Sequence, residues 1–380
     1  MTNPLKLNCI VALDDGYAVN KCAFWRDGKI DSVSVPSAAV RGRVMSDADD
    51  RSAGAYNVGT DAAGRAIEFT IASRGIGGDI EQTRVPDYAV SDLNRALVHH
   101  TLIRAGFGGR KIVLGTALPM RGYFEDGAQD AKKGSLARPV VSLGGEPIAA
   151  PVHQHVYAQA LSAWVDHVID ENGQPISDTH DDGEPVDRRD LVIGIIDVGG
   201  RTTDFAVVWV EGSTPVLARG RSGSVDLGML DVIDALLPML QQRFNIKDIN
   251  PVQLEAAVRG GTLKLWGKPH DVSQEIAAAA TETARRLVTE VQRRIGSGAN
   301  LDRLLFVGGG SVVLREALTR EYPHVYVAEQ ADLANARGML KYMSFIDPTA
   351  MAEAQALGAG DASPGGDGVV SLSQRRGSGA

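Results

Sequence analysis

Short apolar runs alternate with polar, glycine-containing turns along the chain, and two stretches share one pattern. Residues 10–24 read IVALDDGYAVNKCAF, and residues 193–208 read IGIIDVGGRTTDFAVV. Each contains an apolar run, an aspartate near its end, a glycine two positions later, polar residues and a second apolar run. Apolar runs that flank Asp and Gly predict β-hairpins. The recurrence therefore predicts two related halves, each built around such a hairpin.

The remaining segments predict helices and further strands. Ser91 precedes a run with helical periodicity and Gly106 ends it, which is typical of a capped helix. Residues 41–87 are rich in Gly, Asp and Ser and predict a small, loop-heavy subdomain. Other expected elements are strands at 29–40 and 111–118, hairpins at 138–150 and 261–272, helices at 152–169, 224–244 and 273–296, a strand–glycine turn–helix unit at 301–322, and a last helix before residue 346.

Length and charge narrow the class of protein. A chain of 380 residues with 44% apolar residues predicts a globular protein of two domains. A net charge of −8 argues against direct binding of nucleic acid. No apolar run is long enough for a bilayer, and the start MTNPLKLN lacks the regions of a signal peptide. Cys9 and Cys22 are expected to pack as small hydrophobic residues, so we expect a cytoplasmic protein without membrane contact.

The two hairpins also suggest a chemistry. A glycine turn exposes backbone N–H groups and lets phosphate oxygens approach them closely. Two such turns across a cleft would grip a triphosphate, with Asp14 and Asp197 placed to hold Mg²⁺ through its water molecules. Lys21 would add positive charge. The alternative is a pair of ordinary hairpins with acidic turn residues, since Asp and Gly favour turns.

A third glycine-rich element, LLFVGGGSVVLREAL at residues 304–318, favours triphosphate binding by the two turns over a pair of ordinary hairpins. Three glycines between a buried strand and a helix allow a nucleotide to lie against bare backbone. The spacing does not match the G-x-G-x-x-G pattern of a Rossmann loop, and the chain has no Walker motif. A phosphate-binding protein with these features must use another fold.

The segments LDDGYAVNK, IIDVGGRTTDFAVV and LLFVGGGSVVL, followed by ANARGMLKYM, resemble the two phosphate loops, adenosine loop and closing helix of the actin, sugar-kinase and heat-shock-chaperone ATPase superfamily. Within it the chain most resembles the ParM/StbA group of plasmid-segregation actins. The resemblance implies an α/β, actin-like (ribonuclease H-like) fold, with a nucleotide cleft between duplicated halves. The implied parts are domain I at 1–190 with a loop-rich subdomain at about 36–87, domain II at 191–346 with a helical subdomain at about 225–298, and a C-terminal tail at 347–380 with a disordered end.

The resemblance also implies ligands and roles. The ligands are Mg²⁺ and ATP, or GTP in its place, and the catalytic residues are Asp14, Asp197 and a Glu or Gln that positions the attacking water. The candidate for the last role is Gln154, at the start of the helix expected at 152–169. The other implied residues are Gly16, Tyr17 and Lys21 in the first phosphate loop, Gly199, Gly200, Thr202 and Thr203 in the second, Asp204 for the water shell of the metal, and Gly308, Gly309, Gly310 and Ser311 at the adenosine.

Two residues depart from the family pattern, and two histidine pairs offer other readings. Tyr17 replaces the small hydroxyl residue frequent in the first loop, and Arg201 stands where many relatives have glycine. Arg201 could reach a phosphate or point to solvent. The H-x-H pattern around Gln154 is expected to be partly exposed histidines rather than a metal site, which needs further ligands. Of the adjacent pair at 99–100, one histidine is expected to pack and one to face water.

Three functions stay open. The resemblance favours a filament-forming ATPase in which hydrolysis weakens the filament, and plasmid segregation would then need a small DNA-binding adaptor. A small-molecule kinase of the same superfamily would place an Asp as base beside a sugar, but the chain lacks an obvious segment for a sugar pocket. A nucleotide-dependent switch without filaments is the third.

Overall fold

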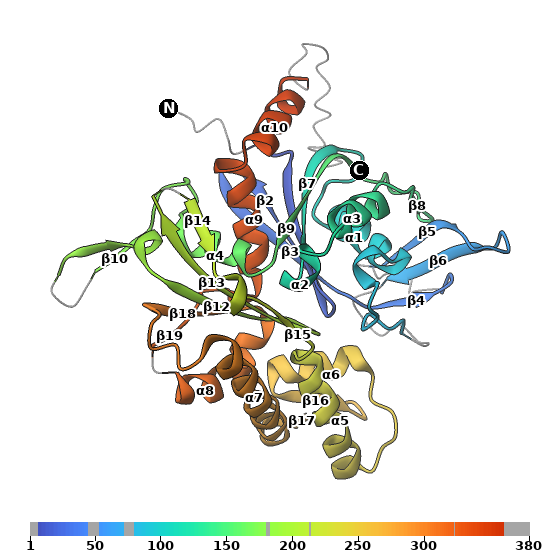
Figure 1. The fold of residues 1–380 in the computed structure, drawn as a ribbon. Coiled ribbons are helices and arrows are strands. Elements are labelled where there is room, and N and C mark those ends of the chain that lie inside the picture. The colour runs from blue at the N-terminus through green and yellow to red at the C-terminus, as the bar shows by residue number, and fades with distance from the viewer. Residues whose placement is uncertain are drawn as a thin grey trace, which may run out of the picture.

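The structure is a computed structural model that describes residues 7–44, 53–71, 80–179, 183–212, 214–322 and 324–360. Two mixed sheets form its centre, and both begin with an antiparallel hairpin followed by parallel strands (Figure 1). The first sheet has the order β3-β2-β1-β7-β9 and the second β14-β13-β12-β18-β19, with β15 also paired to β13. The strands are β1 (Ile10–Asp15), β2 (Val19–Arg26), β3 (Lys29–Pro36), β7 (Lys111–Leu118) and β9 (Ala150–Ala158) in the first sheet, and β12 (Ile193–Val198), β13 (Thr203–Glu211), β14 (Thr214–Leu217), β15 (Gly223–Val225), β18 (Arg303–Val307) and β19 (Val325–Val327) in the second.

The two predicted hairpins are therefore confirmed as β1–β2 and β12–β13. β1 and β12 are buried along their whole length, because a strand at the centre of a mixed sheet is covered on both faces. This accounts for the near-continuous apolar runs before Asp14 and before Asp197.

The loop-rich subdomain is a small sheet packed on α1 (Asp92–Arg104). Its strands have the order β4 (Ala39–Arg41), β6 (Ala66–Ile71), β5 (Gly54–Thr60) and β8 (Val141–Ser142). Ser91 caps α1 as predicted, since its Oγ accepts from Asn94 N at 3.1 Å. The hairpin expected at 138–150 is wrong, because β8 pairs with β5 and β9 pairs with β7. Two helices lie between β7 and β8, α2 (Met120–Tyr123) and α3 (Ala128–Leu136).

The helical subdomain of the second half lies below the second sheet in Figure 1. The helices expected at 224–244 and 273–296 and the hairpin at 261–272 are all present. α6 was not predicted. The elements are α5 (Met229–Phe244), α6 (Pro251–Gly260), β16 (Thr262–Leu265), β17 (Lys268–Asp271), α7 (Ser273–Ile295) and α8 (Gly309–Glu321).

The helix predicted at 152–169 is wrong in its first half. Residues 150–158 form β9, which pairs in parallel with β7, and the helix α4 begins only at Leu161 (Leu161–Val168). The segment APVHQHVYA fits a strand because its β-branched and aromatic residues pack well on a pleated surface. The segment became a strand because it pairs with β7 at the edge of the first sheet. The local sequence does not reveal this pairing.

The two halves are joined by a crossing of α4 with α9 (Ala334–Phe345). α4 packs on the core of the second sheet, around Ile193 and Ile195, whereas α9 packs on the first sheet, around Ile10 and Ala12. Residues 334–345, assigned to domain II in the sequence analysis, thus pack on the first half.

The region expected as a tail begins with helix α10 (Pro348–Gly360), which packs on the first sheet. The end expected to be disordered, 361–380, lies outside the described residues. A short hairpin, β10 (Ser177–Thr179) with β11 (Pro185–Asp187), projects from the second half (Figure 1). Within the described residues, neither Cys9 nor Cys22 forms a disulfide, and among the helices in these ranges none has the length and apolar character needed to cross a membrane.

Candidate functional site

The first loop joins β1 to β2, and the alternation of side chains along β1 decides which aspartate faces the cleft. Asp14 lies opposite Lys21 in the antiparallel pair, with Lys21 Nζ 3.5 Å from Asp14 Oδ2. Asp15 points to the other face, where it pairs with the buried amine of Lys132. A Cβ at Gly16 would come within 2.9 Å of the backbone of the returning strand, so the turn requires glycine. Asp14, Gly16 and Lys21 line one cavity, as predicted.

The second loop joins β12 to β13 and is fastened to the start of α5. Gly199 N donates to Thr202 O at 2.9 Å, which closes the turn. Met229 N, the first of α5, donates to Gly199 O at 3.0 Å. Asp197, Gly199, Gly200 and Thr202 line the same cavity as the first loop.

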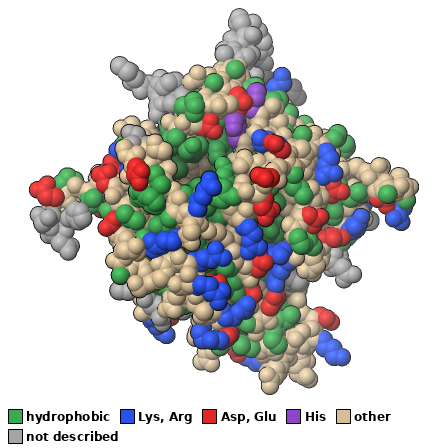
Figure 2. Space-filling view, in the orientation of Figure 1, with side chains coloured by type: hydrophobic (Ala, Val, Ile, Leu, Met, Phe, Trp, Pro, Cys, Tyr) green, Lys and Arg blue, Asp and Glu red, His purple; other side chains and the backbone are tan. Residues whose placement is uncertain are grey.

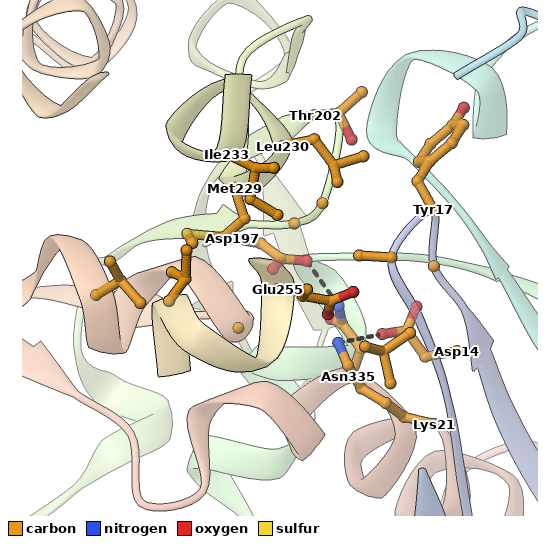
Figure 3. A pocket seen from close by; sticks show the side chains of 18 of the residues that line it. Asp14, Tyr17, Lys21, Asp197, Thr202, Met229, Leu230, Ile233, Glu255 and Asn335 are labelled. Atoms are coloured by element: carbon orange, nitrogen blue, oxygen red, sulfur yellow. Dashed lines mark hydrogen bonds and ion pairs between the residues drawn. The ribbon is translucent and has the colours of Figure 1, made fainter. Parts of the chain in front are cut away.

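The cavity between the two loops brings Asp14 and Asp197 together (Figure 3). Its volume is about 60 Å³. Asn335 Nδ2, from α9, donates to Asp197 Oδ2 at 2.6 Å. Burial, and after it the negative charge of Asp14, raises the pKa of Asp197 to about 6. A cation bound beside these two buried carboxylates would offset both the burial of Asp197 and the nearby negative charge of Asp14.

The glutamine beside this cavity is Gln159, and the assignment of Gln154 is corrected. Gln154 lies within β9, where its backbone is paired with Leu114 of β7. Gln159 follows the end of β9 and precedes α4, and its Nε2 donates to Asp14 Oδ1 at 2.8 Å. It lines the cavity, whereas Gln154 does not. Once residues 150–158 are recognised as a strand, Gln159 stands at the strand-to-helix junction.

Two residues assigned to the second loop lie outside the cavity. Thr203 is fully buried, and its Oγ1 donates to Leu227 O at 2.7 Å. Asp204 accepts hydrogen bonds from Met120 N at 2.6 Å and from Ser224 Oγ. Burial, and then the charge of Asp197, raises the pKa of Asp204 to about 7. The assignment of Asp204 to a metal's water shell is corrected accordingly, because its carboxylate binds the junction of α2 with β15.

Of the four residues predicted in the third glycine element, Gly309 lines the cavity, and Val313 of the same element lines it as well. Gly308 has a φ of +82°, and a Cβ there would collide with the carboxylate of Asp197. A Cβ at Gly310 would collide with β12. Ser311 is fully buried, and its Oγ donates to Gly308 O at 2.7 Å. Gly308, Gly310 and Ser311 therefore allow close packing of α8 on β12 rather than lining the site.

The far end of the cavity is built by side chains that the sequence analysis did not single out. Most are apolar, but α6 adds a charged pair in which Arg259 Nη2 donates to Glu255 Oε1 at 3.2 Å. Burial raises the pKa of Glu255. The spacing of four residues between this Glu and Arg, which is typical of an ion pair on one helix face, could have predicted α6. The residues at this end are Met229, Leu230 and Ile233 of α5, Glu255, Val258 and Arg259 of α6, and Val313 of α8.

Arg201 and Arg84 each contact a residue of the opposite half across the cleft. The guanidinium of Arg201, on the second loop, lies 5.5 Å from the ring centroid of Tyr17, on the first. Arg84, which follows the loop-rich sheet, pairs with Asp234 of α5, with Nη2 3.1 Å from Asp234 Oδ1, and also donates to Leu230 O at 2.7 Å. Arg201 thus points neither to open solvent nor into the cavity, since its side chain is 22% exposed and lies on Tyr17.

His153 and His155 are partly exposed, as expected, but they lie on β9 rather than on a helix. Both contact one carboxylate of α10, with His153 Nδ1 3.2 Å and His155 Nε2 2.6 Å from the oxygens of Glu353. His99 and His100 are both buried, so the expectation that one of them faces water is wrong. Within the described ranges, no group of three or more His, Cys, Asp or Glu is arranged to hold a metal ion.

Comparison with known proteins identifies the fold. Residues 195–320 match the family model "Archaeal actin homologue MreB-like, C-terminal". No curated protein matches the sequence. Among solved structures, the pCBH ParM non-polymerisable quadruple mutant matches with a TM-score of 0.65 and 18% identity, covering 88% of this chain and 98% of that one. A 15-stranded ParM filament from Clostridium botulinum matches with a TM-score of 0.63 and 18% identity, again covering 88% and 98%.

Ta0583, an archaeal actin homolog, also matches, with a TM-score of 0.65 and 19% identity over 87% of this chain and 98% of that one. Its complex with ADP matches with a TM-score of 0.64. The chain therefore has the actin-like fold in two domains, and residues 195–320 of its second half are similar to the C-terminal region of the MreB-like archaeal actin homologues.

Proposed function

We propose that this actin-like chain binds a nucleoside triphosphate, ATP or GTP, with Mg²⁺ in the cleft between its halves, hydrolyses it slowly and polymerises into filaments. One observation carries the proposal: Asp14 and Asp197, at the ends of two separate strands, line one cavity between two glycine turns. Loops that present backbone N–H groups and a nearby Lys21 suit phosphate oxygens.

Asp14 and Asp197 are the residues that would hold Mg²⁺, largely through its water molecules. Their chemistry fits the ion, because both are buried carboxylates and the charge of Asp14 helps to raise the pKa of Asp197. When bound, the ion would neutralise charge on the phosphates. Lys21 would contribute a fixed positive charge beside them.

Gln159 is our candidate for positioning the attacking water. Its amide is already oriented by the hydrogen bond to Asp14, and it faces the space between the two loops. A neutral amide can orient water but is a poor base, so hydrolysis is expected to be slow. The apolar side chains of Met229, Ile233 and Val313 would receive the base and sugar.

Nucleotide entry would require the halves to separate. The cavity of about 60 Å³ is far smaller than the several hundred Å³ of pockets that enclose whole small molecules. An opening and closing of the cleft would couple nucleotide binding to the shape of the subunit, and thus to assembly.

Filament formation is supported by the ParM filament of Clostridium botulinum, which has the same fold. We extend the proposal to plasmid DNA segregation in the cytoplasm through a DNA-binding adaptor, because a chain with a net charge of −8 is poorly suited to bind DNA itself.

Light scattering of the purified chain with Mg²⁺ and ATP or GTP tests the proposal. The signal is expected to rise on nucleotide addition and to fall as nucleotide is spent, while phosphate release follows in parallel. Asp197→Ala should abolish hydrolysis. No rise at tens of micromolar protein, together with sugar-stimulated ADP release, would instead support the kinase.

Gln159 and Gln154 form a matched pair of variants for the catalytic assignment. Gln159→Ala is expected to lower kcat for hydrolysis by roughly 10- to 100-fold, because the water loses its orienting group. Gln154→Ala should leave kcat unchanged, since this side chain lies outside the cavity. Equal kcat values for the two variants would refute the role of Gln159. Nucleotide affinity of both variants, measured by titration, controls for damage to the binding site.

A further inference from the structure

A second concave surface, distinct from the nucleotide cavity, lies where α2 meets β14, β15 and the segment between them. Figure 2 shows Lys and Arg side chains gathered over the middle and lower part of one face of the molecule. The groove has a volume of about 370 Å³. We call it the arginine groove, lined by Met120, Arg121, Phe124, Leu217, Arg219, Ser222, Gly223, Ser224 and Arg294.

The charged residues that line the arginine groove are all basic. Three of the described lining residues are arginines and none is acidic. Within the described parts of the chain, Arg219 and Arg294 form no ion pair, and Arg121 has only a loose one, with Nη1 3.9 Å from Asp226 Oδ2 at an exposed position. An arginine without a carboxylate partner keeps its donors available for an anionic group.

The groove is also partly apolar, which distinguishes it from a plain charged surface. Phe124 is 50% exposed at its edge, and the guanidinium of Arg219 lies 5.8 Å from the centroid of its ring. Met120 and Leu217 add apolar wall. Exposed aromatic and arginine side chains around one concave surface are typical of the residues that dominate protein interfaces.

We propose that the arginine groove binds an acidic segment of a partner protein, one that carries carboxylates together with an apolar or aromatic side chain. The arginines would pair with the carboxylates, and Phe124 would contact the apolar side chain. Because the chain as a whole has a net charge of −8, an acidic partner is repelled by the surface on average, so the basic groove would favour docking at this place. Nucleic acid fits less well, because its binding surfaces are extended and basic rather than a short groove with apolar walls.

The groove spans both halves of the molecule. Met120, Arg121 and Phe124 follow β7 of the first sheet, whereas Leu217, Arg219 and Ser224 belong to the second half.

The two walls are joined close to the nucleotide cavity. Arg121 Nη2 donates to Ser224 O at 2.9 Å, and Ser224 Oγ donates to Asp204, the strand partner of Asp197. If the opening of the cleft changes the spacing of the two walls, a segment that contacts both walls binds one cleft state more tightly than the other. This part of the inference rests on the proposed function.

Fluorescence anisotropy with the full chain tests the groove without nucleotide. The probe is a labelled peptide of alternating Glu and Gly with one central Phe, compared with the same peptide carrying Gln for Glu. We expect the Glu peptide to bind, and Arg219→Glu to weaken its affinity by at least roughly tenfold. Lys264→Glu, the same charge change at an exposed position of β16, should leave the affinity within about twofold.

Exchanging the charges of the peptide and of the groove gives a second test, which stays valid if Arg219→Glu alone damages the fold. A Lys-containing version of the peptide should bind Arg121→Glu/Arg219→Glu better than it binds the parent chain. Equal binding of the Glu and Gln peptides, equal losses in Arg219→Glu and Lys264→Glu, or displacement of the peptide by duplex DNA would each overturn the proposal.

Adding ATP and Mg²⁺ tests the coupling separately. The affinity for the Glu peptide is expected to change at least severalfold when nucleotide binds, and nucleotide affinity should change by the same factor when peptide is present. Unchanged peptide affinity in a sample that demonstrably binds ATP overturns the coupling. Failure to bind ATP overturns the proposed function instead, and the nucleotide-free titration still reports on the groove.

Discussion

At the residue scale, Asp197 and Asp204 lie opposite each other on β12 and β13. Their pKa values are raised to about 6 and about 7, in both cases first by burial. An ordinary aspartate in the unfolded chain titrates near 3.8. Between these values the folded chain keeps protons that the unfolded chain has lost. The free energy of unfolding must therefore fall as pH rises through this window.

Asp197→Asn should remove much of the free-energy cost of ionising a buried carboxylate in the folded chain. At pH 8, without Mg²⁺ or nucleotide, the variant is expected to be more stable than the parent by roughly 1 to 3 kcal/mol, and the difference should vanish near pH 4. Urea unfolding at pH 4, 6 and 8 measures it. A variant that is less stable at pH 8 would contradict the raised pKa.

Asp178 is a suitable control, because folding lowers its pKa whereas folding raises the pKa of Asp197. Burial acts to raise its pKa, but hydrogen bonds from Arg188 and Arg303 prevail and lower it to about 2. Its ionised form is thus favoured by folding, and that stability is lost only as pH falls toward 2. Asp178→Asn is expected to destabilise the chain at pH 8, whereas Asp197→Asn stabilises it.

At the element scale, the crossing of α4 and α9 holds the two halves at one point. A Cβ on Gly338 of α9 would collide with the backbone oxygen of Ser162 on α4. Only glycine lets the two helices approach this closely. The sequence predicted a helix around Gly338 and another at 152–169, which contains α4, but it did not predict that the two helices cross.

Gly338→Ala is expected to destabilise the chain by about 1 to 3 kcal/mol, because rigid backbone would have to move to admit the methyl group. Gly134→Ala is the matched control, in the exposed interior of α3, where a Cβ meets nothing within 4 Å. This control should gain about 0.5 to 1 kcal/mol from helix propensity. Thermal unfolding of both variants measures the contrast, and equal shifts would argue against a close crossing.

At the scale of the whole molecule, the cleft is bridged at its mouth by Arg84 and Asp234, with side chains that are 32% and 60% exposed. An exposed pair contributes little to global stability. It does oppose separation of the halves, however, and separation is the step that nucleotide exchange requires in our proposal.

Arg84→Ala is therefore expected to speed release of a fluorescent ATP analogue by roughly two- to fivefold, with little change in unfolding. Stopped-flow displacement by unlabelled ATP measures the rate. Arg65→Ala, which breaks an exposed ion pair with Asp61 inside the loop-rich subdomain, should leave release unchanged. Faster release in both variants would point to a general loss of stability rather than to the bridge.

The sequence by itself determined the features that depend on neighbours along the chain. The two glycine turns after Asp14 and Asp197, the cap at Ser91 and the helix at 273–295 follow from local turn chemistry, capping and periodicity. The resemblance based on these segments also predicted the actin-like fold correctly.

Only the tertiary structure decided which side chains share a space. β9 became a strand because β7 offered an edge to pair with, and this moved the catalytic assignment from Gln154 to Gln159. Asn335 reaches Asp197 from α9, and α6 brings Glu255, through contacts between segments far apart in the chain. Local propensity does not account for such partners. The burial of His99 was therefore decided by packing within the first half, and the position of Asp204 by its contact with Met120 of the first half.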